Sequence, residues 1–222
     1  MKKIIFFGSG GGGNLKFIYE YFQSYNNLFK VVSVITDRFC GASEFALKNG
    51  IPLRIMSFNR EKNEDKLLID TINNFQPDII ITNIHKILSE QIVSEFKGKL
   101  INLHYSYLPA FGGIIGMTPV DLAIKRNNLF FGCTVHFVDE KVDNGITISQ
   151  GMVIYKESNN LYQSVFECGA MTLLSGLYKL YGYDEINFKS IKEYLISPFT
   201  SKFDLDLSQK IILKLQTEND SI

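Results

Sequence analysis

Residues 3–22, KIIFFGSGGGGNLKFIYEYF, decide the class of fold. The stretch opens with apolar residues and then runs through a glycine-rich segment from Gly8 to Gly13. After it, apolar side chains recur at the three- and four-residue spacing of a helix. This order predicts a buried strand, a glycine loop and a helix. Such a loop presents backbone N–H groups at the start of a helix, where they bind anions.

The same alternation of apolar runs and amphipathic segments continues along the chain. It predicts further strands at 31–36, 52–56, 79–82 and 100–103, and helices at 42–49, 61–75 and 90–96. The helix at 61–75 is expected to bury Leu67, Leu68, Ile72 and Phe75. Strands that are apolar throughout and alternate with helices favour a parallel sheet covered on both faces.

The pattern changes after Pro119. A helix is expected at 120–126, two longer strands that could pair at 132–138 and 147–154, and a long helix at 161–180. One of the two late strands is expected to be antiparallel to the others. The tail after Tyr183 is polar and weakly periodic. We therefore expect an α/β fold, a mostly parallel sheet flanked by helices with a late antiparallel strand, over 1–182, followed by a C-terminal extension over 183–222.

Composition narrows the class of protein. The chain has 222 residues, 23 basic and 23 acidic, and 45% hydrophobic residues, which suits a folded domain and argues against a general nucleic-acid binder. No apolar run approaches the about 18 residues of a transmembrane helix. Three scattered cysteines and three histidines at unrelated spacings predict reduced thiols and no metal site. A cytoplasmic protein without a membrane partner is expected, either a monomer or a homodimer.

The glycine loop has three possible uses. Gly8-x-Gly10-x-x-Gly13 followed by Asp37 at the end of the second strand is typical of nicotinamide-dinucleotide binding. The glycines can also merely allow a tight turn. In the third interpretation, Gly12, Gly13 and Asn14 hold a phosphate of a substrate, and the side chain of Asn14 either caps the helix or donates to that phosphate. The loop by itself leaves these alternatives open.

A polar group follows the fifth strand. Asn102 and His104 are two positions apart, so in extended chain both side chains project from the same face. They emerge at the carboxyl end of a parallel strand, where open α/β sheets bind their ligands. The loop at 138–145 carries Asp143 and can bring a carboxylate to this end of the sheet. His136, in the preceding strand, is expected to be a hydrogen-bonded core or supporting histidine.

Two of these segments resemble a known family. Residues 101–109, INLHYSYLP, resemble the NxHxSxLP signature of formyltransferases that use 10-formyltetrahydrofolate, and residues 132–145, GCTVHFVDEKVDNG, resemble their second signature. The resemblance extends over about residues 1–180. It implies a Rossmann-like formyltransferase fold and 10-formyltetrahydrofolate as co-substrate, and it displaces the nicotinamide interpretation, since a nicotinamide enzyme needs neither motif.

The resemblance also implies roles for individual residues. Asn102 and His104 would stabilise the oxyanion of the tetrahedral intermediate, Asp143 would raise the pKa of the imidazole, and Thr134 would add a hydrogen bond near the amine. Gly12, Gly13 and Asn14 would bind the acceptor's phosphate. The folate would contact a further set of residues: Arg60, His85, Lys86, Ile87, Leu88, Asp139 and Glu140.

The acceptor is less well determined. Within the family the chain most resembles the members that formylate glycinamide ribonucleotide in purine biosynthesis. However, residues 114–119 lack the histidine-rich stretch usual there, and Gly169 stands where an acidic residue is expected to contact that acceptor. The segment 104–109, HYSYLP, is also similar to sugar N-formyltransferases, which act on nucleotide-linked amino sugars. The alternatives are therefore an amino-sugar acceptor or, in a different class, a non-catalytic folate- or nucleotide-binding protein.

Overall fold

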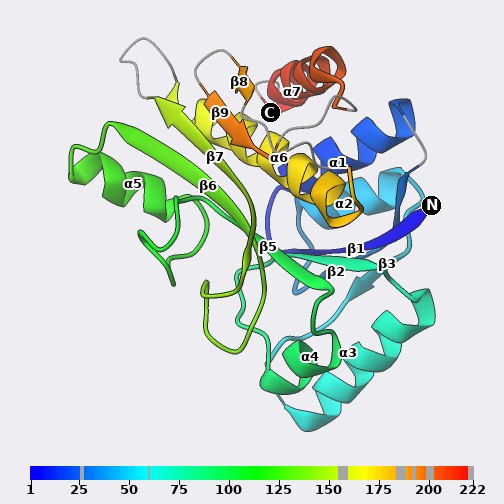
Figure 1. The fold of residues 1–222 in the computed structure, drawn as a ribbon. Coiled ribbons are helices and arrows are strands. Elements are labelled where there is room, and N and C mark those ends of the chain that lie inside the picture. The colour runs from blue at the N-terminus through cyan, green and yellow to red at the C-terminus, as the bar shows by residue number, and fades with distance from the viewer. Residues whose placement is uncertain are drawn as a thin grey trace. The chain divides into compact units, whose positions relative to one another are not determined.

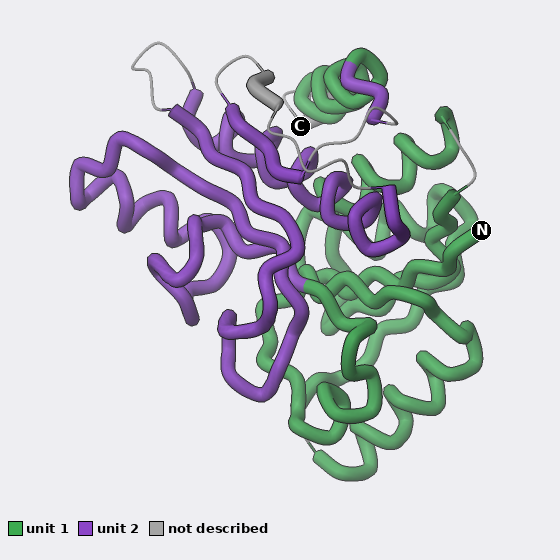
Figure 2. The backbone as a smooth tube through the Cα atoms, viewed as in Figure 1, with its two compact units in different colours: residues 1–101, 206–222 green, residues 102–205 purple. Residues whose placement is uncertain are grey.

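The structure, a computed structural model, describes residues 1–25, 28–59, 61–154, 160–183, 189–191, 194–198 and 203–219. The prediction for Arg60 lies outside these residues. The chain divides into two compact units, which are coloured separately in Figure 2. Unit 1 comprises residues 1–101 and 206–222, and unit 2 comprises residues 102–205.

Unit 1 contains the parallel part of the sheet. Its strands are hydrogen-bonded in the order β3-β2-β1-β4-β5, with β1 Lys2–Gly8, β2 Phe29–Thr36, β3 Leu53–Ile55, β4 Ile79–Asn83 and the start of β5 Leu100–His104. Gly8 is in register with both Thr36 and Asn83, so three strands end together at the glycine loop. The predicted parallel sheet is confirmed.

Helices cover both faces of these strands. Figure 1 shows α1 Gly13–Ser24 and α2 Gly41–Lys48 on one face, and α3 Lys62–Phe75 and α4 Glu90–Glu95 on the other. In α3 the buried side follows Asp65, Leu68 and Ile72. The prediction that Leu67 is buried is wrong, because its side chain is 60% exposed. Adjacent helical positions point about 100° apart, so burying Leu68 turns Leu67 toward solvent.

Unit 2 contains the antiparallel part. Its strands follow the end of β5 in the order β6 Phe130–Phe137, β7 Thr147–Ile154, β9 Tyr194–Ser197 and β8 Lys189–Ile191. Its helices are α5 Thr118–Lys125 and α6 Leu161–Leu180. The pairs β6–β7 and β7–β9 are antiparallel, which confirms the predicted late antiparallel strand. Helix α6 packs closely on β7: a Cβ at Gly151 would lie 2.6 Å from Cys168 Sγ.

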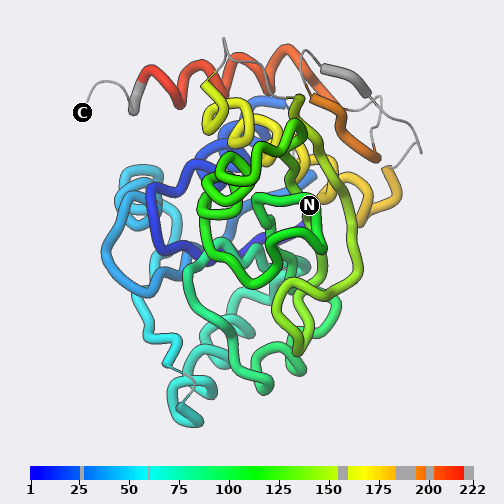
Figure 3. Tube along the Cα trace, turned by 90° about the vertical axis from the view of Figure 1, so that its left-hand side faces the viewer, coloured from blue at the N-terminus to red at the C-terminus, as the bar shows by residue number. Residues whose placement is uncertain are grey.

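The tail holds more regular structure than its polar sequence suggests. Strand β9 extends the sheet of unit 2, and α7 Leu205–Asn219 belongs to unit 1. Ile211, Ile212 and Leu215 of α7 are buried, and Lys214 forms an ion pair with Glu20 of α1 at 2.9 Å. Figure 3 shows α7, in red, beside the blue N-terminal helix. A separate extension over 183–222 stays a prediction.

Candidate active site

A histidine and a carboxylate meet in unit 2. His104 is the last residue of β5 and its side chain is 5% exposed. Asp143 lies in the β6–β7 loop with a positive φ of 55° and a side chain that is 10% exposed. The structure places Asp143 Oδ2 3.3 Å from His104 Nδ1. Asn102 lies two positions before His104 in β5, so the two side chains leave the strand on the same face.

The loop after β5 closes around this pair through its backbone. Gly113 N donates to Asp143 Oδ2 at 2.7 Å, and the carbonyl oxygen of Phe111 lies 3.1 Å from His104 Nε2. Both loop residues have positive φ, 58° at Phe111 and 79° at Gly113. The sequence does not predict these two contacts, because the loop makes them through its backbone. Only the glycine pair Gly112-Gly113 indicates an unusual turn there.

Thr134 anchors the same loop to β6. Its hydroxyl donates to Ser106 O at 2.8 Å and accepts from Leu108 N at 3.1 Å. The threonine is fully buried. The expectation that Thr134 binds near the amine is therefore replaced by a structural role, because its hydroxyl is already committed to the loop backbone.

A third residue, His136, completes the buried group. It lies on β6, two positions after Thr134, and its side chain is 2% exposed. Its Nε2 atom is 3.5 Å from Asp143 Oδ1, and its Nδ1 atom is 2.8 Å from Phe137 O. The sequence predicts a hydrogen-bonded core histidine here but gives no sign that it touches Asp143, because the contact depends on how the β6–β7 loop folds back.

Burial and charge act in opposite directions on these groups. Burial has the largest effect on the pKa of His104 and lowers it, the Asp143 charge and the Phe111 carbonyl raise it, and the charge of His136 lowers it. The net shift is downward. The predicted contribution of Asp143, which raises the pKa of His104, is confirmed, although the net shift is downward. For Asp143, burial raises the pKa, but donors at His136 and Gly113 and both imidazole charges together hold it below its ordinary value.

The glycine loop in unit 1 is open toward solvent at one end and closely packed at the other. Gly10 and Gly11 have no heavy atom within 4 Å of where a Cβ would be, whereas a Cβ at Gly12 would lie 2.9 Å from the Cα of Ala42. Gly12, with φ of 74°, is the N-cap of α1 and supplies no side-chain cap. The start of an α-helix is where backbone N–H groups can bind an anion, and the glycine loop lies at this end of α1.

The side chain of Asn14 does not cap α1. Its Nδ2 atom donates to Asn83 Oδ1 at 3.1 Å, which joins the helix to the end of β4. Arg38 donates to Ser9 O through Nε and Nη2, and Asp37 is 5% exposed with Oδ2 3.8 Å from the Arg38 guanidinium.

The residues expected to bind folate lie in both units. His85, Lys86 and Ile87 are exposed and Leu88 is half-buried, in the segment after β4, where His85 N donates to Ser9 Oγ at 3.0 Å. Asp139 and Glu140 are exposed in the loop after β6. Their contacts with folate stay a prediction.

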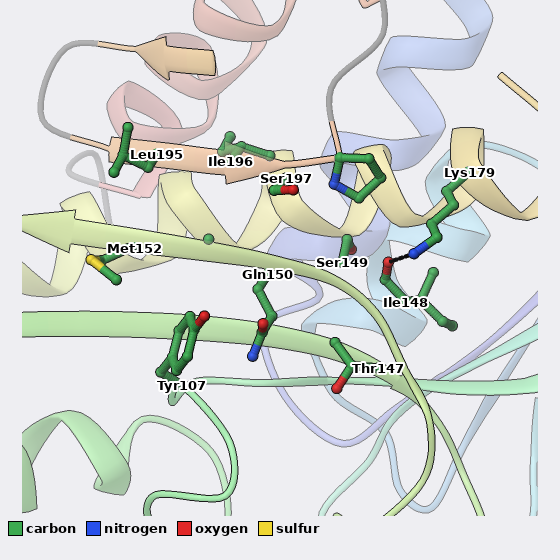
Figure 4. Close-up of a pocket in the computed structure, with 12 residues that line it drawn as sticks. Tyr107, Thr147, Ile148, Ser149, Gln150, Met152, Lys179, Leu195, Ile196 and Ser197 are labelled. Atoms are coloured by element: carbon green, nitrogen blue, oxygen red, sulfur yellow. Dashed lines mark hydrogen bonds between the residues drawn. The ribbon is translucent and has the colours of Figure 1, made fainter. Parts of the chain in front are cut away.

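A cavity of about 250 Å³ lies elsewhere in unit 2, against β7 and β9. Figure 4 shows Gln150 and Tyr107 among its lining side chains and Lys179 reaching the Ile148 carbonyl. Neither His104 nor Asp143 lines it. Within the described ranges, no three His, Cys, Asp or Glu side chains are grouped to hold a metal ion, and no helix is long and apolar enough to cross a membrane.

Comparison with known proteins decides the family. Residues 2–173 match the formyl transferase family, more than three quarters of the chain. The chain belongs to this family. The predicted resemblance to this family is thereby confirmed.

Relatives of this formyl transferase carry more than one name. It is 34% identical over 161 residues to a chloroplastic phosphoribosylglycinamide formyltransferase of Vigna unguiculata, covering 68% of this chain and 51% of the relative. It is 32% identical over 113 residues to a formyltetrahydrofolate deformylase of Haemophilus influenzae, covering 50% of this chain and 40% of the relative. The chain thus spans about half the length of the curated relatives it matches.

Solved structures agree on the fold. A phosphoribosylglycinamide formyltransferase from Streptococcus pneumoniae superposes with a TM-score of 0.65 at 27% identity, covering 81% of this chain and 96% of that one. A glycinamide ribonucleotide transformylase from Geobacillus kaustophilus gives a TM-score of 0.73 at 24% identity, covering 82% and 100%. These likenesses confirm the predicted Rossmann-like formyltransferase fold.

Proposed function

We propose that this chain transfers the formyl group of 10-formyltetrahydrofolate to a primary amine, that of glycinamide ribonucleotide, a step of purine biosynthesis in the cytoplasm. The observation that carries the proposal is the buried contact between His104 and Asp143 at the carboxyl end of β5, with Asn102 on the same face. The names of the relatives support the donor and the acceptor.

The reaction needs no covalent enzyme intermediate. The amine nitrogen attacks the formyl carbon, a C–N bond forms, and the carbonyl electron pair moves to oxygen. Asn102 Nδ2 and His104 Nε2 donate hydrogen bonds to that oxyanion, and loss of one such donor typically costs about 100- to 1000-fold in rate. When the intermediate collapses, the bond from the formyl carbon to N10 of the folate breaks, and the proton that leaves the amine is delivered to N10.

Asp143 fixes the direction of the imidazole. Its Oδ2 accepts from Nδ1, and its negative charge favours the protonated ring, in which Nε2 also carries a proton and can donate it to the oxyanion. In the present arrangement Nε2 faces the carbonyl oxygen of Phe111. The developing oxyanion would take the place of this neutral acceptor, and an ionised acceptor makes the stronger hydrogen bond.

Different residues are proposed to bind the acceptor and the folate. We propose that backbone donors of Gly12, Gly13 and Asn14 hold the acceptor's phosphate, since glycines let the loop backbone approach an anion closely at the start of α1. The folate is proposed to contact the exposed segment after β4 and the loop after β6: His85, Lys86, Ile87, Leu88, Asp139 and Glu140, together with Arg60.

A nucleotide-linked amino sugar is the second candidate acceptor. The ring of Tyr105 lies where a side chain at Gly169 would be, with Cε1 2.7 Å from the position of a Cβ. No acidic side chain can therefore extend from position 169 while Tyr105 keeps its place. This favours an acceptor that does not need a carboxylate there.

The test is an acceptor comparison with the purified chain. 10-Formyltetrahydrofolate is supplied with glycinamide ribonucleotide, with a nucleotide-linked amino sugar, or with no amine, and the formylated product is identified by mass spectrometry. We expect formylation of glycinamide ribonucleotide. Formylation of the amino sugar alone would show that the amino sugar is the acceptor. Equal release of formate with and without an amine would show that the chain hydrolyses the donor instead of transferring its formyl group.

A further inference from the structure

The cavity in unit 2 lies where β9 separates from β7. The pairing of the two strands ends at Gln150 and Ser197. Residues 147–149 of β7 lie beyond that last pair, and they line the cavity. About 250 Å³ is available there, a little less than in the usual pocket for a drug-sized ligand, so the cavity suits a small molecule with a single ring.

One end of the cavity is apolar. Gly132 of β6 has no side chain and Tyr107 lies directly on it, since a Cβ at Gly132 would be 2.7 Å from the Tyr107 Cβ. Gly132 is in register with Met152 of β7, which is in register with Leu195 of β9. Tyr107, Met152 and Leu195 thus form an apolar row across β6, β7 and β9. Tyr107 is 48% and Leu195 37% exposed, so this row is open to a ligand.

The row lies on the face of the sheet opposite α6. A Cβ at Gly151 would meet Cys168 and Thr172 of α6, so Gly151 faces this helix. Met152 is the next residue of β7, and successive side chains of a strand point to opposite faces. The apolar row is therefore separated by the sheet from the packed interior against α6.

The other end of the cavity is positively charged. Lys179, near the end of α6, donates from Nζ to the carbonyl oxygen of Ile148 at 2.8 Å. Figure 4 shows this contact, which fixes the ammonium group at the cavity and uses one of its three N–H donors. Among the described residues that line the cavity, Lys179 alone has a charged side chain. The lining therefore favours an anion.

Neutral polar groups lie along β7 and β9 between the two ends. Gln150 and Ser197 are register partners, and both side chains are half-buried. An amide and a hydroxyl both donate and accept hydrogen bonds, so they can meet a polar substituent of either kind. The cavity thus combines an apolar surface, neutral hydrogen-bonding groups and one cation, which is the usual make-up of a small-molecule site.

We propose that this cavity is a second binding site, which takes a small aromatic carboxylate whose ring lies on the apolar row and whose carboxylate meets Lys179. A single lysine balances a single charge, so a carboxylate fits better than a phosphate monoester, whose charge is nearer two. An aromatic ring fits better than an aliphatic chain, because it can stack on the tyrosine and contact the methionine sulfur.

This site is separate from the candidate active site. Neither His104 nor Asp143 lines the cavity, and the proposed reaction uses none of the residues that give it its chemistry. The inference therefore does not rest on the proposed function, and binding at the cavity can be measured without any formyl transfer.

Nuclear magnetic resonance of the methionine methyl groups tests the site in the unmodified chain. The chain has five methionines, whose ¹³C-labelled methyl signals can be assigned by single replacement with leucine. A ring on the apolar row should shift the signal of Met152 and leave that of Met171, which is buried on α6. We expect phenylacetate to do this with a Kd of about 1 mM or tighter, and its neutral counterpart phenylacetamide to bind about tenfold more weakly.

Matched variants separate the charge from the cavity. Lys179→Met and Lys179→Gln both remove the charge, and the glutamine amide can still donate to the Ile148 carbonyl. Each should weaken phenylacetate binding about tenfold and change phenylacetamide binding by less than about threefold. Lys66→Met removes an exposed lysine of α3 in unit 1 and should bind phenylacetate as the unmodified chain does. Ser197→Phe places a ring in the cavity and should abolish the shift at Met152.

Circular dichroism establishes that each variant is folded before its binding is compared. Equal affinities for phenylacetate and phenylacetamide, or an unchanged Kd in folded Lys179→Gln, would overturn the inference. A larger shift at Met56 or Met117 than at Met152 would place the probe elsewhere, and no shift with about 20 mM phenylacetate would show that the cavity does not bind it. Either result would also overturn the inference.

Discussion

Replacing Asp143 by asparagine should remove most of the turnover while keeping the fold. The asparagine side chain has the same shape, and its Oδ1 can still accept from Gly113 N, which now donates to the carboxylate at 2.7 Å. What disappears is the negative charge 3.3 Å from His104 Nδ1. The imidazole would then lose the charge that favours its protonated form, which is the form that can donate from Nε2 to the formyl oxygen.

The magnitude follows from that distance. Two unit charges 3.3 Å apart attract by about 5 kcal/mol at an effective dielectric constant of about 20. Part of this attraction is offset by the cost of burying the charges, so we expect a net loss of about 3 kcal/mol in transition-state stabilisation. At about 1.4 kcal/mol per tenfold, kcat should fall by about 100- to 300-fold.

The assay is steady-state formyl transfer with the best acceptor, comparing Asp143→Asn with Asp70→Asn, an exposed aspartate on α3. The control variant should keep the kcat of the unmodified chain. The double variant Asp143→Asn, His104→Ala should lose little more than His104→Ala alone, because the two groups act as a unit. A kcat for Asp143→Asn within about threefold of the unmodified chain, with an unchanged circular dichroism spectrum, would refute the reasoning.

Three further outcomes are expected. The pKa values of His104 and Asp143 are both lowered in the folded chain. Their contributions to stability are therefore present above the unfolded-state pKa values of about 6.5 and 3.9, and are lost on acidification. Urea unfolding at several pH values checks this, and the difference in unfolding free energy between the unmodified chain and Asp143→Asn should shrink below about pH 4. Gly12→Ala should destabilise by about 1–3 kcal/mol in the same assay, because of its positive φ and the nearby α2 backbone, whereas Gly10→Ala, which meets open space, should change stability by less than about 1 kcal/mol. A thiol reagent should modify only Cys40 in the folded chain, since the other two cysteines are buried, and a second equivalent consumed without denaturant would contradict this.

The sequence predicts the parallel half of the fold well because its signals are local. A buried strand, a glycine loop and a helix leave distinct periodicities, and the expected α6 segment agrees with the observed Leu161–Leu180. Strand β9 and helix α7 were not predicted, because four residues are too few to show a period and the apolar positions of α7 are separated by polar ones. Their burial depends on partners distant in the chain.

The candidate site is likewise predictable from the sequence only where its signals are local. Asn102 and His104 can be placed on one face from strand alternation alone. The contacts of Asp143 with His104 and His136 depend on the conformation of the β6–β7 loop, in which Asp143 has a positive φ. No local sequence pattern predicts that conformation. The lowered pKa of His104 likewise follows from burial, which outweighs the neighbouring charge that the sequence shows.

The proposed activity is the movement of a formyl group from folate to an amine. A single-turnover reaction with 10-formyltetrahydrofolate carrying ¹³C in the formyl group, mixed with excess chain and glycinamide ribonucleotide, tests it directly. We expect the ¹³C label to appear in the amide of formylglycinamide ribonucleotide, and Asp143→Asn to slow its appearance at least about 100-fold. Label that remains on the folate, or that appears as free formate whether or not the amine is present, would contradict it.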